Sequence, residues 1–481
     1  MPYTYYLTGC TQDDIEDCYY RGEVNNIFVK NVEAGDTIVL PAGSAEWGDY
    51  NRGNQGRIYF ILPITVRGQG DSTVITLAEN GSTYVSGIIN LWSTVTFADM
   101  KIIGANTRPV TAFVANSHNN SGVPGGINFT GGFRITNITY EGRSGGAYVL
   151  YFTPGITSGG LIDNCRCSAS VGNTELFFGR GPTNAWQLNN TIGTSSNIFI
   201  EDCLFSNNGY VCDANSNAYM VVRFCTISSP QKVDGHGVAS NTPARSYRNM
   251  EVYHNTWTHP TAGGWTAIEM RGATFMLFNN LAAGFAGAFY LTDYGYLDLW
   301  GNFGNVYQTP VNYPITDQIG VGKDPKVAGS EPAYLWGNKN NAGAAWPRTL
   351  KNIPQGAINQ YRTQTGDPNS TFTEKTMIQA NRDFYASAGF DSDGTGVSVG
   401  TRAEMDALTP PFAKYGFWVT NEGSWNKTPG GQQGRLYTWS GSAWTLSYEP
   451  YTYPHPLRGI VYLQKTLKRL GRHLKLRGLS G

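Results

Sequence analysis

Charged residues are scarce in this chain of 481 residues: Asp, Glu, Lys and Arg make up 15% of it, against roughly 25% in an average globular domain. Abundant Gly (59) and Pro (23) predict many turns and few helices. No apolar run approaches the roughly 18 residues of a transmembrane helix, so no membrane span is expected. The first residues also lack the basic and then apolar regions of a signal peptide, so we expect a signal that was removed or another route out of the cell.

Cysteine is present in an odd number, seven, which excludes a framework in which every thiol of one chain is paired. Cys10 and Cys18 are a pair that could staple the N-terminal region. No Cys-x-x-Cys pair and no His/Cys spacing typical of zinc occurs, so no structural metal is predicted.

One short phrase recurs eight times between residues 99 and 302: a strand rich in β-branched or aromatic residues turns through one residue into a residue of modest size. The turning pairs are Asp99-Met100, Asn137-Ile138, Asn164-Cys165, Asp202-Cys203, Phe224-Cys225, His254-Asn255, Asn279-Asn280 and Gly301-Asn302. Successive pairs lie 22 to 38 residues apart, as expected of one wound coil with loops of variable length. In such a solenoid the second members stack in one column about 4.8 Å apart, where thiols pack and amides form hydrogen-bond ladders.

The chain divides into five predicted segments. They are an N-terminal cap with the first coil (1–60), the coils (61–330), an irregular wrapping or linking segment (331–395), a small aromatic-rich β module (396–450) and a basic tail (451–481). Residues 11–20 start with Thr and acids, which predicts a short helix that covers the first coil. Residues 415–448 alternate aromatic and polar residues around Gly turns, which predicts a β-meander whose aromatics form either its core or a platform for sugar rings.

The end of the chain, residues 458–481, holds seven Lys or Arg and no acid. Without it the remaining chain has 28 basic and 35 acidic residues, so the net charge of zero is a cancellation. Four leucines (Leu463, Leu467, Leu470 and Leu474) follow a helical spacing and would form one apolar stripe on a basic helix. Such a helix can dock on a partner, an acidic surface or a membrane, and a solvated tail is the alternative.

The phrases GDTIVLPAG (35–43), ITVRGQG (64–70) and STVITL (72–77) resemble the opening coils of right-handed parallel β-helix proteins of the pectate-lyase-like superfamily. The resemblance extends to about residue 330. It implies an all-β fold, a right-handed parallel β-helix (solenoid) with an N-terminal helical cap, and a polysaccharide as the partner. This superfamily includes polysaccharide lyases, glycoside hydrolases, epimerases and phage tailspikes, so the fold does not settle the function.

A second strand follows each ladder position by about 10 to 14 residues, and stacking brings these strands together as well. Alternate side chains of a strand share a face, so Glu269 and Arg271 point outward if Ile268 and Met270 point into the core. The predicted catalytic residues on this outer stripe are Asp213, Asp234, His236, Glu269 and Arg271. The predicted substrate-binding residues are Arg180, Trp265, Asp293 and Tyr294. An open groove of this kind suits a long polymer, whose cleavage needs groups for proton transfer and charge neutralisation.

The fragment Asp234-Gly-His236-Gly, followed by Arg271, is similar to the pattern of polygalacturonase-type hydrolases. That resemblance implies a catalytic carboxylate at Asp213, a helper at His236 and a subsite cation at Arg271. Asp213 stands alone where the pattern has adjacent acids, so Asp234 or Glu269 would supply the second carboxyl. An inverting pair lies about 6.5–9.5 Å apart, which two stacked coils would span.

A lyase is the second enzymatic alternative. Its base would be one of Arg180, Arg245, Arg248 and Arg271. A lyase would use Ca²⁺ held by Asp213, Asp234 and Glu269, and no other cofactor is expected. A third alternative is that these charges only form cross-strand pairs that keep the surface soluble.

The sequence therefore predicts a protein that cleaves an acidic extracellular polysaccharide by lyase or hydrolase chemistry. The alternative is a glycan-binding protein of a virion or cell surface, tailspike-like and without activity, that assembles or oligomerises through its basic tail. Either protein would act outside the cell or on a virion, without a nucleic-acid partner. The cluster of His, Arg and carboxylates favours the enzyme. The 415–448 module, which resembles short modules of phage tail proteins, favours the alternative.

Overall fold

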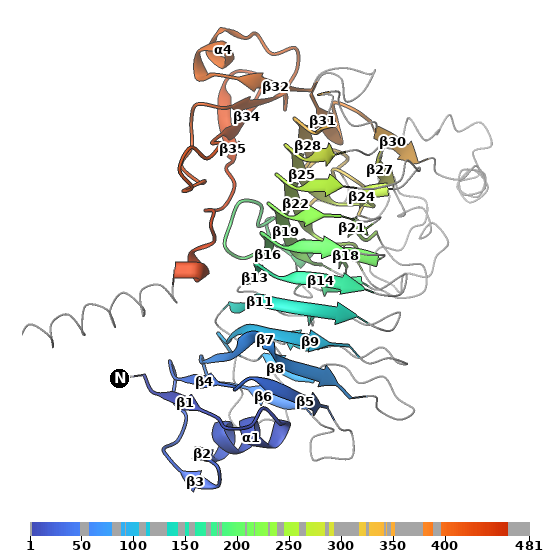
Figure 1. Cartoon of the computed structure of the whole chain (residues 1–481). Coiled ribbons are helices and arrows are strands. Elements are labelled where there is room, and N and C mark those ends of the chain that lie inside the picture. Colours follow the sequence, from blue (N-terminus) through green and yellow to red (C-terminus); the bar gives the residue numbers. More distant parts are fainter. Residues whose placement is uncertain are drawn as a thin grey trace, which may run out of the picture. The chain divides into compact units, whose positions relative to one another are not determined.

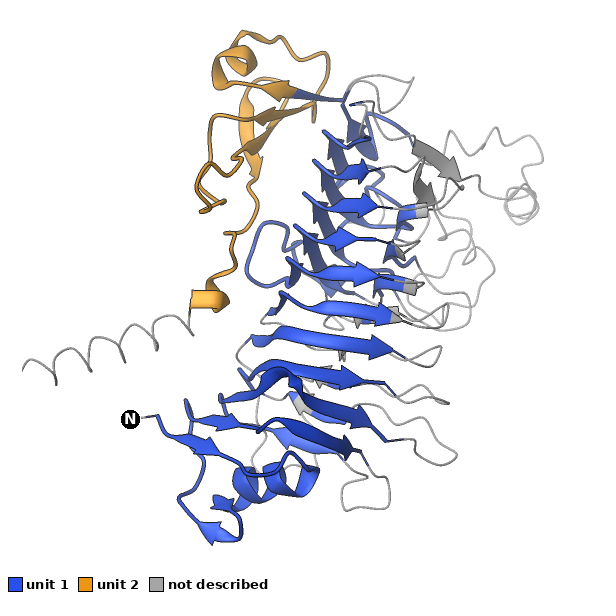
Figure 2. Ribbon diagram, viewed as in Figure 1, with its two compact units in different colours: residues 1–398 blue, residues 399–481 orange. Residues whose placement is uncertain are grey.

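The computed structural model divides the chain into two compact units, residues 1–398 and 399–481 (Figures 1 and 2). It describes all residues except 1, 49–56, 79–87, 92, 105–111, 116–131, 143–149, 153–158, 170–174, 180, 182–184, 207–208, 216, 229–230, 238–244, 259–265, 284–287, 293–316, 324–326, 341–342, 344–347, 352–378, 388–395 and 460–481. None of the helices in the described part combines the length and the apolar character needed to cross a membrane.

The first unit contains two long sheets of parallel strands (Figure 1). The larger sheet has 19 strands: β1 (Thr4–Tyr6), β4 (Thr37–Val39), β5 (Gly43–Trp47), β7 (Thr65–Leu77), β9 (Thr96–Ile103), β11 (Phe133–Gly142), β13 (Gly160–Asp163), β14 (Arg166–Ala169), β16 (Ile198–Glu201), β17 (Leu204–Ser206), β19 (Tyr219–Arg223), β20 (Thr226–Ile227), β22 (Asn249–Tyr253), β23 (Thr256–Thr258), β25 (Thr274–Phe278), β26 (Leu281–Ala283), β28 (Ala333–Trp336), β29 (Lys339–Asn340) and β31 (Phe384–Ala386). The smaller sheet has ten: β6 (Ile58–Phe60), β8 (Ile89–Leu91), β10 (Phe113–Ala115), β12 (Leu150–Phe152), β15 (Glu175–Gly179), β18 (Gly209–Ala214), β21 (Gln231–Gly235), β24 (Thr266–Met270), β27 (Ala288–Thr292) and β30 (Arg348–Lys351).

The chain passes back and forth between these sheets. After β15 of the smaller sheet it forms β16 and β17 of the larger one, and then returns to the smaller sheet as β18. Apolar side chains at matching register positions form columns along each sheet, for example Ile162, Ile200 and Val222 in the larger sheet. Residues of both sheets belong to one hydrophobic cluster, and Phe177 of β15 contacts Phe205 of β17 with ring centroids 6.1 Å apart. The core therefore joins the two sheets, and the fold is mostly β, as predicted.

Five of the predicted turning pairs, from Asn164-Cys165 to Asn279-Asn280, lie where one strand of the larger sheet ends and the next begins, whereas Asp99-Met100 lies within β9 and Asn137-Ile138 within β11. The first members of the first seven pairs, Asp99 through Asn279, all adopt φ between 52° and 57°. Among residues other than Gly, this left-handed conformation is most often adopted by Asn and Asp. The second members of the later pairs stack: Asn255 Nδ2 donates to Asn280 Oδ1 at 3.1 Å, and Asn280 Nδ2 donates to Asn338 Oδ1 at 2.8 Å. The predicted column is confirmed for these rungs.

Gly301-Asn302 lies outside the described residues, and the rung after Asn280 is occupied by Asn338 between β28 and β29. The parallel pairing also extends past residue 330, because β28, β29 and β31 join the larger sheet and β30 joins the smaller one. Four strands of the two parallel sheets therefore lie within the segment 331–395 that was predicted to be irregular.

A short helical segment follows β1 near the N-terminus, where a helix over residues 11–20 was predicted. Helix α1 (Gln12–Glu16) starts at Thr11, whose hydroxyl accepts from the Asp14 backbone N–H while the Asp14 carboxylate accepts from the Thr11 backbone N–H. A π-helical turn, η1 (Asp17–Arg21), follows and ends at Gly22 with φ 69°. A small antiparallel hairpin, β2 (Glu23–Val24) and β3 (Ile27–Phe28), completes this region. All seven cysteines of the chain are free and buried, so no bridge joins Cys10 to Cys18.

A four-stranded sheet follows in the order β32 (Val397–Gly400), β33 (Gly416–Val419), β34 (Arg435–Trp439) and β35 (Trp444–Tyr448); β32 spans the boundary between the units, and the other three strands belong to the second unit. The last three strands form the predicted antiparallel meander. Helix α4 (Arg402–Ala407) contributes Met405 to a small core with Phe417 and Val419. Trp418 and Trp425 are buried, whereas Trp439 and Trp444 are partly exposed with ring centroids 5.4 Å apart.

Two short 3-10 turns complete the described elements. They are η3 (Ala185–Gln187) in the first unit and η5 (Pro456–Arg458) in the second.

Candidate functional site

Three carboxylates occupy adjacent positions in the smaller sheet. Asp213 on β18 pairs in register with Asp234 on β21, and Asp234 pairs with Glu269 on β24. Val233 and Ile268, which precede Asp234 and Glu269, belong to the hydrophobic core. Because side chains alternate along a strand, the three carboxylates lie in one row on the opposite face.

Two of the strands that carry these carboxylates, β18 and β24, have a bulge just before the carboxylate. The register between β18 and β21 shifts between Tyr210 and Cys212, and the register between β24 and β27 shifts between Thr266 and Ile268. Each shift leaves one extra residue in the strand, which is the definition of a bulge, and bulges are common beside functional sites because they redirect side chains. After each bulge the carboxylates return to register with their neighbours.

His236 and Arg271 continue the row beyond the strand ends. The His236 backbone N–H donates to the Ala214 carbonyl at 2.8 Å, and the Arg271 backbone N–H donates to the Gly235 carbonyl at 2.9 Å. The parallel ladder therefore extends by one position past β21 and β24. This extension places the imidazole of His236 beside the guanidinium of Arg271.

The guanidinium of Arg271 holds Asp234. Its Nε donates to Asp234 Oδ1 at 3.0 Å, and a terminal guanidinium nitrogen, Nη2, pairs with Oδ2 of the same carboxylate. That Nη2 also lies 3.0 Å from His236 Nδ1. Burial of the guanidinium is the largest single effect and lowers the pKa of Arg271. The nearby carboxylates, Asp234 first among them, together outweigh burial, so the pKa is raised. Arg271 is therefore a permanent positive charge in this cluster.

One carboxylate oxygen, Asp213 Oδ1, is buried without a hydrogen-bond partner. His236 Nδ1 lies 3.3 Å from this oxygen. A ring nitrogen can carry a hydrogen and donate, or lack it and accept. His236 Nδ1 can therefore donate to Asp213 or accept from Arg271, and each arrangement excludes the other.

Lys232 is a member of the cluster that sequence reasoning missed. It pairs with Glu269, lies 3.7 Å from Asp234 Oδ2, and has its ammonium 4.6 Å from the ring centroid of Tyr210. Burial lowers its pKa, but Asp234 and Glu269 outweigh that effect and the pKa is raised. The signal was present, because Lys232 stands two residues before Asp234 and so shares its face.

The predicted open groove is not what the described residues form around the carboxylates. Asp213, Asp234 and Glu269 are 3%, 1% and 4% exposed, so the expectation that they line an exposed stripe is wrong. The basic side chains are more accessible: 25% of the His236 side chain is exposed, against 14% for Lys232 and 13% for Arg271. Buried carboxylates need partners, and Arg271 and Lys232 supply them for two of the three.

The other predicted site residues do not join this cluster in the described structure. Arg180, Trp265, Asp293 and Tyr294 lie outside the described residues. Arg245 pairs with Asp317, and Arg248 pairs with Glu331, with its side chain fully buried. These two arginines are therefore engaged elsewhere and are not bases for a lyase reaction at this cluster.

The donor set is a poor match for calcium. Ligand atoms of Asp213, Asp234 and His236 lie within 4.8 Å of one another. Calcium takes six to eight oxygen ligands, whereas this group offers one imidazole and two carboxylates. Arg271 already occupies Asp234 and contacts His236, so a cation entering here would meet a guanidinium. The residues do not fit the ion that a lyase of this superfamily would be expected to use.

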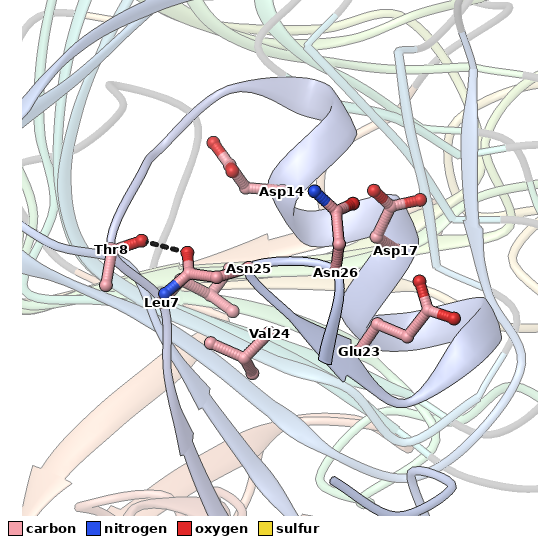
Figure 3. A pocket seen from close by; sticks show the side chains of 8 residues that line it. All are labelled: Leu7, Thr8, Asp14, Asp17, Glu23, Val24, Asn25 and Asn26. Carbon is pink, nitrogen blue, oxygen red and sulfur yellow. Dashed lines mark hydrogen bonds between the residues drawn. The ribbon is translucent and has the colours of Figure 1, made fainter. Parts of the chain in front are cut away.

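A separate hollow lies at the N-terminal end (Figure 3). Figure 3 shows three carboxylates around it, those of Asp14, Asp17 and Glu23, together with the side chains of Asn25 and Asn26. The Thr8 hydroxyl donates to Asn25 Oδ1 across one side of this hollow. The hollow contains no basic side chain among its lining residues, so it is electrostatically unlike the row of carboxylates on β18, β21 and β24.

Comparison of the sequence with protein-family models gives no match, and comparison with curated proteins gives none either.

Proposed function

We propose that the first unit is a right-handed parallel β-helix of the pectate-lyase-like type and that the protein cleaves an acidic extracellular polysaccharide by elimination. The fold part of this proposal is supported by the regular alternation of the chain between two parallel sheets. The chemical part is supported by one observation above all: a row of carboxylates holds two cations and a partly exposed imidazole at the end of neighbouring strands.

Elimination from a uronic-acid unit begins with removal of the proton on the carbon next to the sugar carboxylate. The electron pair of that C–H bond forms a C=C bond as the bond to the leaving glycosidic oxygen breaks, and that oxygen takes a proton. The reaction therefore needs a base, a cation on the substrate carboxylate and a proton donor. His236 is the base in this proposal, because it is the most exposed titratable side chain of the cluster.

Arg271 has the role of substrate cation. A sugar carboxylate that draws the guanidinium toward itself would end the contact between Arg271 and His236 Nδ1. Nδ1 would then carry the hydrogen and donate it to Asp213 Oδ1, which leaves Nε2 as the basic nitrogen. Binding of an anionic substrate would in this way prepare the base.

Hydrolysis is less well supported by the contacts. A hydrolase needs one protonated carboxyl group as acid and a second carboxylate as base or nucleophile. Asp234 pairs with Arg271 and Glu269 pairs with Lys232, so both carboxylates are engaged by cations of the cluster. Of the three carboxylates in the row, this leaves only Asp213 to act as the acid or the base, whereas a hydrolase needs two.

A screen of uronic-acid polysaccharides and neutral polysaccharides tests the proposal. Ultraviolet absorbance detects the unsaturated ends that elimination produces, and a reducing-end assay detects both elimination and hydrolysis. We expect absorbance with at least one acidic polymer, a loss of at least 100-fold with His236→Gln, and a comparable loss with Asp213→Asn. Asp202→Asn is the matched control, because Asp202 lies in a turn of the larger sheet where Asn is equally suited to φ 53°.

The second candidate is a glycan-binding protein without activity, on a virion or cell surface. The burial of Asp213, Asp234 and Glu269 favours it, since covered and paired carboxylates can serve stability alone. Retention by a polysaccharide in affinity electrophoresis, without new reducing ends and without absorbance, would support this candidate and reject the enzyme. Reducing ends without absorbance would instead indicate a hydrolase.

A further inference from the structure

Exposed apolar side chains concentrate at the N-terminal end of the chain. Among the described residues twelve large hydrophobic side chains are exposed, and six of them lie within the first 29 residues. Three of the six are consecutive: Ile27, Phe28 and Val29 are 68%, 61% and 38% exposed. We call these three residues the hairpin patch. Three adjacent apolar side chains this exposed are a feature of surfaces that contact another protein.

The hairpin that carries the patch is small but well anchored. Strands β2 and β3 pair only through Glu23 with Phe28 and Val24 with Ile27. Asn25 and Asn26 turn the chain with φ of 55° and 59°, and the Val29 backbone N–H donates to the Gly22 carbonyl at 2.8 Å. An isolated two-stranded hairpin is marginally stable. The anchored turn thus holds the apolar side chains in place without burying them.

The acidic hollow of Figure 3 shares this hairpin. Glu23, Val24, Asn25 and Asn26 line it, together with Asp14 and Asp17 of the preceding helical segment. The whole N-terminal segment is negatively charged like the hollow, because residues 2–36 contain seven Asp or Glu and two Lys or Arg. The N-terminal end therefore offers an apolar contact beside a negatively charged hollow.

The complementary surface is encoded at the other end of the same chain. Residues 458–481 carry seven Lys or Arg and no acid, and Leu463, Leu467, Leu470 and Leu474 recur at the spacing of one helix face. We propose that the hairpin patch and acidic hollow of one copy bind this basic, leucine-striped segment of a second copy. The leucines contact the patch, and a Lys or Arg enters the hollow beside Glu23, because Asp17 pairs with Arg21 and the Asp14 carboxylate accepts from Thr11.

Such a contact joins two different surfaces and is therefore head-to-tail. After binding, the pair as a whole keeps one free surface of each kind, so assembly can continue beyond a pair. Charge attraction steers the contact and weakens when salt shortens the screening length. The apolar part gives the contact a component that salt does not remove.

Two full-length variants in combination test the proposal by light scattering coupled to size-exclusion chromatography. Phe28→Asp damages the patch and leaves the basic segment intact. A triple change, Lys468→Glu, Arg469→Glu and Arg472→Glu, damages the segment and leaves the patch intact. We expect the parent protein to grow in mass with concentration, each variant alone to be monomeric, and an equimolar mixture to form a species of twice the monomer mass and no larger one.

Leu204→Asp is the matched control, because Leu204 is exposed to 41% on a strand of the larger sheet far from the hairpin in sequence. This variant should assemble like the parent, and circular dichroism should show the same folded content for all variants. A parent that is monomeric at every concentration overturns the proposal. A mixture that stays monomeric overturns it as well, since it would mean that the two surfaces do not meet between copies.

Discussion

The amide ladder of the larger sheet makes a strong prediction about Asn280. Its side chain is 1% exposed and takes part in four hydrogen bonds: Oδ1 accepts from the backbone N–H and from Nδ2 of Asn255, both at 3.1 Å, and Nδ2 donates to Val252 O and Asn338 Oδ1 at 2.9 and 2.8 Å. Asn280→Ala removes all four. Asn338 Oδ1 keeps the backbone N–H of Asn280 as a donor at 3.1 Å. The backbone N–H of Asn255 loses the acceptor that Asn280 provides.

The size of the effect follows from that loss. A buried donor left without its partner costs about 1–3 kcal/mol, and the space vacated by the amide adds to the cost. We therefore expect Asn280→Ala to lower the free energy of unfolding by about 2–3 kcal/mol. Urea unfolding followed by circular dichroism measures this difference. Asn280→Cys should lose less, because thiols already occupy the same column at Cys165, Cys203 and Cys225.

Thr226→Ala is the control for this experiment. Thr226 is the next residue after Cys225, a member of the column, but its side chain is exposed. Its removal should change the free energy of unfolding by no more than about 0.5 kcal/mol. If Asn280→Ala is as mild as Thr226→Ala, the column is not a tightly bonded ladder and the account of the larger sheet given above is refuted.

Three further outcomes are expected. Burial lowers the pKa of His254 to about 4 from 6.5, so the unfolded state binds a proton first as pH falls; stability should therefore be lost between about pH 6.5 and 4, by up to about 3 kcal/mol. In His254→Phe, which imitates Phe224 in the same column, this part of the pH dependence of urea unfolding should be absent. Arg223→Met should cost about 3–5 kcal/mol because it removes the guanidinium that pairs with the buried carboxylate of Glu201. The double variant Arg223→Met/Glu201→Leu should recover most of that loss; equal stability of the two variants would contradict the pairing. All seven thiols are buried, so Ellman's reagent should modify none of them before unfolding, and rapid reaction of any thiol in the native protein would disprove that burial.

The turns of the larger sheet were predictable because they depend on single residues. Asn and Asp tolerate the left-handed conformation, and several of the turning positions carry one of them, so the repeat is visible in the sequence. Phe224 and His254 adopt the same conformation without that preference, and only their spacing marks them. The rung at Asn338 was missed because 58 residues separate it from Asn280, and a long insertion removes the spacing that makes a repeat recognisable.

The candidate site was predictable in its register and not in its exposure. Alternation along β18, β21 and β24 places Asp213, Asp234 and Glu269 in one row, which is a local property of strands. Exposure depends on what other parts of the chain pack over a face, and no local pattern carries that information. Lys232, in contrast, could have been predicted and was missed, because its spacing of two residues from Asp234 places it on the same face.

In the column of Cys and Asn rungs, the stacking of the rungs is independent of the length of the chain segments that connect them. Successive rungs stay hydrogen-bonded although Cys225, Asn255, Asn280 and Asn338 are 30, 25 and 58 positions apart in the sequence. The length of chain between two rungs therefore has little influence on how they stack. Evolution or an engineer can lengthen, shorten or exchange the intervening segments and so alter what the protein contacts, while the stack that determines its architecture is left unchanged.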